Sequence, residues 1–191
     1  MEAISKELFD RVRKYAMGAE SPSRFEHSIR VAETARRMCE IYGEDAEKGY
    51  FAGMAHDICK DFDDETLIGI ASRDGNPISD MEREKPGLLH GRAAAVKLRE
   101  DFGVQDAEIL QSVERHTLGG ADLCPLAKIV FAADKIEPGR PQSSKEYLDR
   151  LFSLSLNQLV LAVVDENINY LLSHGRTVAE ESYNFRKSLI D

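Results

Sequence analysis

The chain has 191 residues, of which 42% are hydrophobic and 31% charged, which suits one compact hydrophobic core and excludes a disordered protein. Its 25 basic and 34 acidic side chains give a net charge of -9, which disfavours general binding of DNA or RNA. No apolar run is long enough for a membrane span, and the N-terminus lacks a basic head followed by an apolar signal core. We therefore expect a cytoplasmic protein with no nucleic-acid or membrane partner.

The three cysteines, Cys39, Cys59 and Cys124, are an odd number, and none belongs to a CxxC pair. This pattern predicts small buried thiols in a reducing compartment rather than disulfides or a zinc site.

Apolar residues recur at helical spacing along most of the chain, first at Ile4, Leu8, Val12 and Tyr15 and then from Ile29 to Tyr42. Alternating, strand-like stretches are scarce. Four later segments continue the helical pattern: Leu88 to Phe102, Asp106 to His116, Pro125 to Ile136, and Leu156 to Ser173. The sequence therefore predicts an all-α fold of about nine helices.

The stretch from Ser72 to Gly87 interrupts this periodicity with two glycines and two prolines. We expect it to be the longest loop, with room for one helical turn, and a candidate lid or rim of a site. No linker divides the chain convincingly, so we expect a single domain over residues 1–191.

Four of the five histidines fall on predicted helices or helix ends, and one of these, His56, is followed at once by Asp57. Asp134 lies inside the apolar run IVFAAD of a later helix. A carboxylate in apolar surroundings is costly unless a cation or hydrogen bonds compensate its charge, and a divalent metal ion does so directly.

With His27 from a separate helix, these residues supply two imidazoles and two carboxylates. Such a set favours octahedral iron(II), manganese or cobalt with open positions for water over a closed zinc site. The chain has neither a P-loop nor a nucleophilic serine in a GxSxG turn, so metal-activated water is the remaining nucleophile.

The order His27, His56-Asp57, Asp134 resembles the H...HD...D signature of the HD-domain metal-dependent phosphohydrolases, which are all-helical. The segments RFEHS, HDICKD, LLHG, RHTLG and FAADKIEPGR are similar, in the same order, to those of the YqeK-type bacterial HD hydrolases, which cut diadenosine tetraphosphate symmetrically. The resemblance implies iron ligands at His27, His56, Asp57 and Asp134. It also implies that Asp57 bridges the two ions if a second one binds.

Several other residues accompany this set. Arg24 and Lys60 lie one helical turn from His27 and His56, and Arg140 follows Pro138-Gly139, which favours contacts with phosphate groups. The resemblance places His90 and His116 at a second metal or at the phosphates, and the hydroxyl of Thr117 beside them. We expect catalytic roles for Asp57, Lys60, His90 and His116, and substrate contacts from Arg24, His27, Lys60, His90, His116, Thr117, Asp134, Arg140, Tyr170 and Arg176.

The resemblance therefore implies hydrolysis of diadenosine tetraphosphate to two ADP, with a site built from residues 24–140 and closed by C-terminal helices over 143–191. Two alternatives stay open: an HD-type hydrolase of another nucleotide, and a non-catalytic regulator that binds metal and nucleotide. One or two ions are expected, and a homodimer is compatible with the apolar faces of short helices. Lys135 stands where a tyrosine is frequent in the family, which puts substrate preference in doubt.

Overall fold

The computed structural model describes residues 4–190, and within that part the chain is helical and contains no strand. Two short 3-10 turns, η1 (Ser72–Asp74) and η2 (Pro86–Leu89), accompany the α-helices. In chain order, the α-helices of the described residues are α1 (Lys6–Ala19), α2 (Pro22–Tyr42), α3 (Ala46–Ala55), α4 (Asp64–Ala71), α5 (Asp80–Glu84), α6 (His90–Asp101), α7 (Ala107–Arg115), α8 (Pro125–Ile136), α9 (Lys145–Phe152), α10 (Leu156–Ser173) and α11 (Glu180–Ser188).

The predicted all-α fold is confirmed, but the expected number of helices is too low. One reason is α5, which lies inside the stretch from Ser72 to Gly87 that was expected to be a loop. Ser79 and Glu82 form a reciprocal capping box at its N-terminus, and this stabilises a helix of only five residues.

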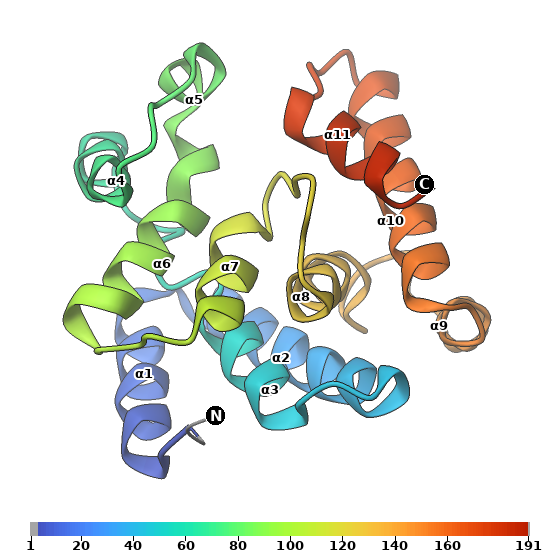
Figure 1. Ribbon diagram of the computed structural model, residues 1–191, viewed down its shortest axis with the longest axis horizontal. Coiled ribbons are helices and arrows are strands. Elements are labelled where there is room, and N and C mark those ends of the chain that lie inside the picture. Colours follow the sequence, from blue (N-terminus) through green and yellow to red (C-terminus); the bar gives the residue numbers. More distant parts are fainter. Residues whose placement is uncertain (1–3, 191) are drawn as a thin grey trace.

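Helix α8 is the centre of the molecule: it packs against α2, α3, α7 and α10, and Figure 1 shows it between these helices. Most of its side chains are buried, as expected for a helix that is apolar on all sides. Asp134 lies near the C-terminal end of this helix, and its carboxylate is therefore placed in the interior of the protein.

Two glycines allow helices to approach closely beside the histidines. A Cβ atom at Gly53 of α3 would lie 2.7 Å from the Cα of Ala32 on α2. At Gly91 of α6, a Cβ would lie 2.9 Å from the carbonyl oxygens of Val113 and Glu114 on α7. A glycine inside a helix lowers its stability relative to alanine, but it lets the two backbones come into contact. These contacts fix how near the histidine-bearing helix ends lie to one another.

The side chain of Arg92 on α6 binds several groups of the stretch from Ser72 to Gly87. The guanidinium of Arg92 donates hydrogen bonds to both oxygens of Asp74, to Glu82, and to the carbonyls of Asn76 and Pro77, at 2.7 to 3.2 Å. The side chain of Arg92 is only 11% exposed. A half-buried arginine with this many acceptors holds the segment firmly against α6.

The three cysteines are free, as predicted; Cys39 and Cys59 are buried, whereas Cys124 is half-buried at the N-cap of α8. Burial raises the pKa of Cys59 to about 12, so its thiol stays protonated and unreactive. No helix within residues 4–190 combines the length and apolarity needed to cross a membrane.

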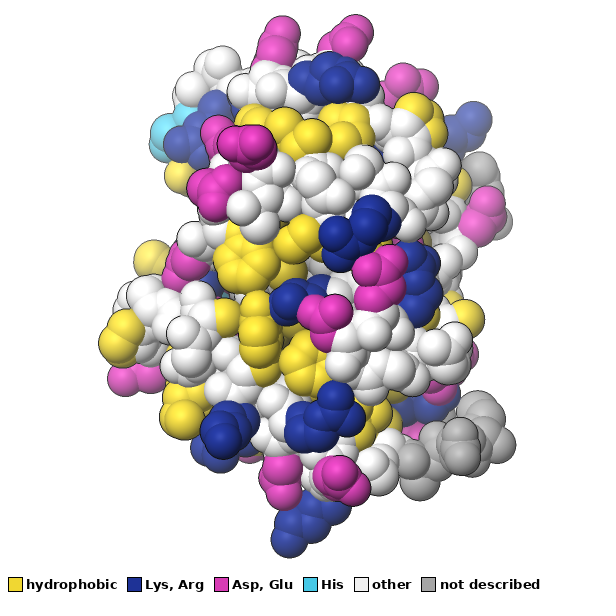
Figure 2. Space-filling model, turned by 90° about the vertical axis from the view of Figure 1, so that its left-hand side faces the viewer, with side chains coloured by type: hydrophobic (Ala, Val, Ile, Leu, Met, Phe, Trp, Pro, Cys, Tyr) yellow, Lys and Arg dark blue, Asp and Glu magenta, His cyan; other side chains and the backbone are white. Residues whose placement is uncertain are grey.

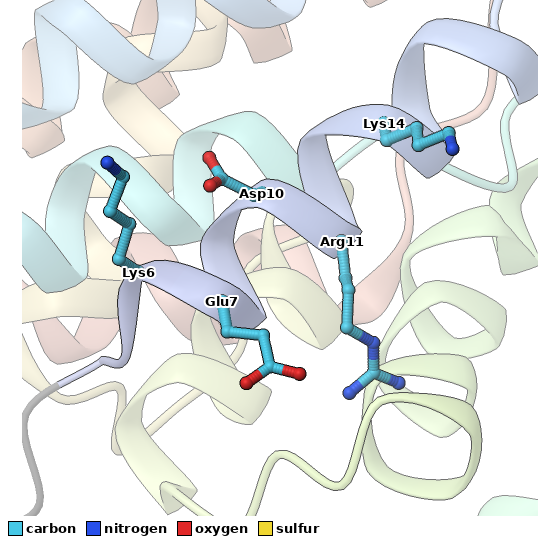
Figure 3. Close-up of a pocket in the computed structure, with 5 residues that line it drawn as sticks. All are labelled: Lys6, Glu7, Asp10, Arg11 and Lys14. Carbon is cyan, nitrogen blue, oxygen red and sulfur yellow. The ribbon is translucent and has the colours of Figure 1, made fainter.

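The surface carries charges of both signs. On the side drawn in Figure 2, basic and acidic side chains are interspersed among exposed hydrophobic groups. A depression of about 430 Å³ on α1 is lined by Lys6, Glu7, Asp10, Arg11 and Lys14 (Figure 3). All five side chains are exposed and come from one helix, so no functional group from another element lines this depression.

Candidate metal centre

Four histidines meet where helices begin or end. His27 lies in the second turn of α2, His56 directly follows α3, His90 begins α6 and His116 directly follows α7. Their rings form a continuous row, with centroids 5.3 Å apart for His27 and His56, 4.9 Å for His56 and His116, and 4.8 Å for His90 and His116. The family resemblance implies that His27 and His56 bind one metal ion and that His90 and His116 lie near a second ion or the phosphates, and the fold brings all four rings together.

Three of these rings are oriented in the same way. The Nδ1 atoms of His56, His90 and His116 lie 2.7, 2.6 and 2.7 Å from the backbone carbonyl three residues earlier. A carbonyl can only accept, so each Nδ1 carries the proton and each Nε2 presents a lone pair to the centre. A histidine held in this tautomer is prepared to be a metal ligand.

The ring of His27 is oriented by side chains instead of a backbone carbonyl. Its Nδ1 lies 3.1 Å from Oε1 of Glu137, and its Nε2 lies 3.0 Å from Oδ1 of Asp134. The guanidinium of Arg30 in turn donates to both oxygens of Glu137. Glu137 therefore orients the ring of His27, as carboxylates commonly do behind metal-binding histidines. Sequence analysis missed Glu137, although it lies within the motif ADKIEPGR.

The two aspartates lie among these nitrogens. An oxygen of Asp57 lies 3.1 Å from Nε2 of His90 and 3.5 Å from that of His116. The Nε2 of His56 lies 3.6 Å from Asp57 and 3.8 Å from Asp134. These separations place carboxylate oxygens next to imidazole lone pairs, an arrangement that a shared cation stabilises.

One atom tests directly whether a metal ion fits. The Nε2 of His56 is fully buried and has no hydrogen-bond partner among the described residues. Leaving a buried acceptor unpaired is costly, and a cation bound to the lone pair removes that cost. Ligand atoms of His27, His56 and Asp134 lie within 4.8 Å of one another, as do those of His56, Asp57 and His116. Both groups include His56, whose single Nε2 lone pair binds one ion, so the residues present fit one metal ion.

The charges of the site have physical causes that agree with this fit. Burial would raise the pKa of Asp57, but the neighbouring imidazoles of His56, His116 and His90 hold it well below its usual range. For Asp134, burial is likewise outweighed, here by the charge of Lys135 and the hydrogen bond of His27. Burial lowers the pKa of His56 to about 4, which keeps its imidazole neutral and free to bind metal.

The predicted phosphate-binding cations surround the two aspartates. Arg24 donates to Asp57 at 2.7 Å and to Asp61 at 3.1 Å, and Arg140 donates to the side chain of Asp134 at 2.7 Å. Both guanidinium groups thus contact the carboxylates themselves. Their side chains are 30% and 39% exposed, which leaves donors available on the cavity side.

The remaining predicted residues lie on the same cavity. The Nζ of Lys60 is 3.3 Å from Nδ1 of His90, and the hydroxyl of Thr117 is 3.2 Å from Nε2 of that ring. Tyr170 and Arg176 are exposed and line the cavity farther along. Lys135, the departure from the family pattern, donates to the carbonyl of His116 and to Asp134.

A single cavity of about 1380 Å³ connects these groups. Its walls include the metal-ligand candidates, the cations, Met81 and Leu88 on one side, and residues of α9 and α10 on another. The predicted sites from Arg24 to Arg176 line this cavity except His56, which is fully buried beneath it. A volume of this size accommodates a ligand larger than one nucleotide.

An all-helical chain that brings imidazoles and carboxylates together at helix ends has the architecture of the HD-domain class. The HD domain family matches residues 24–139, more than half of the chain, and the chain belongs to this family. A symmetrical bis(5'-nucleosyl)-tetraphosphatase of Staphylococcus aureus is 34% identical over 69% of this chain and 67% of its own length. The enzyme of the same name from Halalkalibacterium halodurans is 31% identical over 81% of this chain and 82% of its own.

A solved structure has the same fold. A Clostridium acetobutylicum protein, described as a predicted HD superfamily hydrolase involved in NAD metabolism, superposes with a TM-score of 0.88 at 32% identity. The match covers 95% of this chain and 96% of that protein, so it includes the helices that follow the HD match.

Proposed function

We propose that this chain is a symmetrical bis(5'-nucleosyl)-tetraphosphatase, a metal-dependent phosphohydrolase that cleaves diadenosine tetraphosphate into two ADP. The observation that carries the proposal is the bare, buried Nε2 of His56 beside Asp57 and Asp134, beneath a cavity lined by cations. Membership of the HD domain family and relatives of this name support it.

In this proposal His27, His56, Asp57 and Asp134 hold the first divalent ion, with iron preferred and manganese or cobalt able to replace it. The Nε2 atoms of His90 and His116 both lie near Oδ1 of Asp57, and together with this oxygen they would hold a second ion. When bound, the metal supplies a water of lowered pKa as nucleophile and polarises a phosphoryl oxygen. Both functions require open coordination positions, which a set of four protein ligands leaves.

The cations bind the tetraphosphate. Arg24 and Arg140 present guanidinium donors that pair with two phosphate oxygens at once, whereas Lys60 acts as a point charge. Arg176 and the hydroxyl of Thr117 add donors on the same cavity. These groups also counter the overall charge of -9, which would otherwise repel a polyanion.

The chemical step transfers one phosphoryl group to water. The oxygen of water forms a bond to one of the two central phosphorus atoms, and the bond from that phosphorus to the central bridging oxygen breaks. When a proton rather than a second ion is shared between His90 and His116, ADP leaves with the bridging oxygen and takes that proton, and the protons of the attacking water pass to solvent. The second ADP carries the oxygen that came from water.

Product analysis tests the proposal. The protein is purified anaerobically and incubated with diadenosine tetraphosphate and iron(II), manganese(II) or cobalt(II), and the nucleotides are separated by ion exchange. ADP as sole product is the expected result. AMP with ATP would move the attacked phosphorus, and absence of product from a metal-loaded protein would overturn the proposal in favour of another nucleotide or a regulator.

Two expectations accompany this function. We propose that the enzyme works in the cytoplasm, in keeping with its free, protonated cysteines. The homodimer remains a prediction that a sedimentation measurement checks.

A further inference from the structure

The loop between α7 and α8 brings Thr117 to the pair formed by His90 and His116. The Oγ1 of Thr117 lies 3.2 Å from Nε2 of His90 and 3.3 Å from Nε2 of His116. Each Nε2 presents a lone pair, because each Nδ1 is hydrogen bonded to a backbone carbonyl. The hydroxyl can therefore donate to either ring, and the residue borders the cavity. A hydroxyl that serves this pair has to be held within a narrow range of positions.

The backbone on both sides of Thr117 is held by side chains from other helices. The carbonyl of His116 accepts a hydrogen bond from Nζ of Lys135 on α8 at 2.9 Å. The carbonyl of Leu118 accepts one from Oγ of Ser182 on α11, also at 2.9 Å. Figure 1 shows the loop that follows α7 extending towards α11. Rotation of either peptide group would turn the Thr117 side chain and break one of these hydrogen bonds.

A second residue of α11 fixes the same loop by packing. Gly119 has a φ of 76°, and a Cβ atom at this position would lie 2.3 Å from Cδ1 of Phe185. The ring of Phe185 is fully buried and meets the ring of Phe131 on α8 edge-on, with centroids 5.0 Å apart. Glycine provides both the left-handed conformation and the space for this ring. The loop therefore has little room to move against α11.

Ser182 and Phe185 lie on one face of α11, because residues three apart in a helix point to the same side. Both are buried, and in the part of the chain that the structure describes neither forms a hydrogen bond or ion pair with a candidate metal ligand. Lys135, by contrast, also donates to Asp134. Helix α11 follows the segment 24–139 that matches the HD domain family, so its contacts reach the site from outside that segment.

We propose that α11 positions the Thr117 hydroxyl for the reaction, with Ser182 and Phe185 as positioning residues. The inference rests on the proposed function, in which a proton shared by His90 and His116 passes to the leaving ADP. Thr117 contacts both rings, and the two residues of α11 act on it through the loop backbone. Other residues bind the metal and attract the tetraphosphate, so loss of this hold should lower kcat more than it raises KM.

A double-mutant cycle tests whether Ser182 acts through Thr117. Ser182→Ala removes the hydrogen bond to the loop, and we expect kcat for diadenosine tetraphosphate to fall by about tenfold, with metal content and KM nearly unchanged. Thr117→Val removes the hydroxyl and should lower kcat by at least as much. Adding Ser182→Ala to Thr117→Val should then change kcat by less than about twofold. Two independent effects that multiply would overturn the proposal, because Ser182 would then support the fold and not this hydroxyl.

Variants of the same helix control for general damage. The hydroxyl of Ser188 donates to the carbonyl of Phe185 within α11, so Ser188→Ala also loses a serine hydrogen bond but should keep kcat. Phe185→Leu keeps an apolar side chain and loses the ring beside Gly119, and its kcat should fall as in Ser182→Ala. Thermal unfolding shows whether Phe185→Leu folds, and if it does not, the cycle with Ser182→Ala decides. An equal loss of kcat in Ser188→Ala and Ser182→Ala would overturn the proposal.

A spectroscopic measurement separates this proposal from the proposed function. The threonines of the chain are Thr34, Thr66, Thr117 and Thr177, so the methyl signal of Thr117 can be assigned by substitution. In the protein loaded with zinc(II), which is diamagnetic, Ser182→Ala should lower the methyl order parameter of Thr117 and leave that of Thr66 on α4 unchanged. If it does so but no dinucleotide is cut, the positioning of Thr117 stands and the proposed hydrolysis falls. If diadenosine tetraphosphate is cut but neither this methyl group nor kcat responds to Ser182→Ala, the hydrolysis stands and the positioning falls.

Discussion

The Nε2 of His90 lies 2.9 Å from the Nε2 of His116, and each ring has its Nδ1 hydrogen bonded to a backbone carbonyl. Two neutral rings in this state would point lone pairs at each other, which is unfavourable. A proton or a metal ion shared between them, with Asp57 beside it, satisfies both. We therefore propose that the pair carries a proton or forms half of a second metal site.

His90→Ala and His116→Ala should each keep a metal ion at His27, His56 and Asp134 and lose turnover. We expect kcat to fall by about two to four orders of magnitude, because the leaving ADP is then not protonated efficiently. Metal per chain by elemental analysis, measured beside kcat, checks this. Complete loss of metal in both variants would contradict the separation of the two functions.

Asp57→Asn should abolish both metal binding and turnover, because the neutral amide cannot balance the charge of a cation in a buried site. The matched control is Asp61→Asn. Asp61 shares Arg24 with Asp57 but is partly exposed and touches none of the histidines, so its variant should bind metal normally. Full activity in Asp57→Asn would refute the site assignment.

Arg140→Ala should retain metal and raise KM for the dinucleotide, by roughly tenfold or more, because a charge-assisted phosphate contact is lost. Steady-state kinetics and metal content are measured together, since Arg140 also donates to Asp134. Arg13→Ala, an exposed position on α1, serves as the control. An unchanged KM would remove Arg140 from the substrate contacts.

Arg92→Ala should release the stretch from Ser72 to Gly87. Asp74 and Glu82 would lose their partner in a site that is largely buried, which is expected to cost about 2–4 kcal/mol of unfolding free energy. Limited proteolysis should then cut within this stretch. Arg73→Ala removes an exposed pair with Glu100 and should change stability by under about 1 kcal/mol. Equal resistance of Arg92→Ala and the unaltered protein to protease would contradict the prediction.

Glu20 gives the stability a specific pH dependence. Burial raises its pKa to about 7 from an ordinary value of 4.5, and one of its oxygens is buried without a hydrogen bond among the described residues. The folded chain therefore holds a proton that the unfolded chain releases, so stability should fall as pH rises from about 4.5 to 7. The loss is on the order of 1–3 kcal/mol.

Urea unfolding of the chelator-treated protein at pH 5 and pH 8 measures this dependence. Glu20→Gln, which cannot ionise, should be less sensitive to pH than the unaltered protein. Glu26→Gln, an exposed glutamate on α2, should retain the full pH dependence. A pH dependence that survives Glu20→Gln in full would show that another group is responsible.

The sequence led to the candidate metal ligands because the conflict between Asp134 and its apolar neighbours is visible along a single helix. Glu137 was not predicted, because its role depends on a contact with His27 from a helix 110 residues away. Helix α5, by contrast, could have been predicted, since Ser79 and Glu82 have the spacing of a capping box. Features set by neighbouring residues could therefore be predicted from the sequence, whereas contacts between residues far apart in the chain could not.

Gly91 allows α6 and α7 to approach closely beside His90 and His116. The distance between the imidazoles of His90 and His116 is set by the contact between α6 and α7, where a Cβ at Gly91 would also lie 3.1 Å from Cε1 of His116. Gly91 has only a hydrogen atom where other residues carry a Cβ, and this lets the two helices approach. The absence of that Cβ therefore limits the size of the ion that fits between the two rings. Gly91→Ala would increase the distance between the rings of His90 and His116 without replacing any candidate ligand. The spacing of the site can therefore be changed while its ligands stay the same.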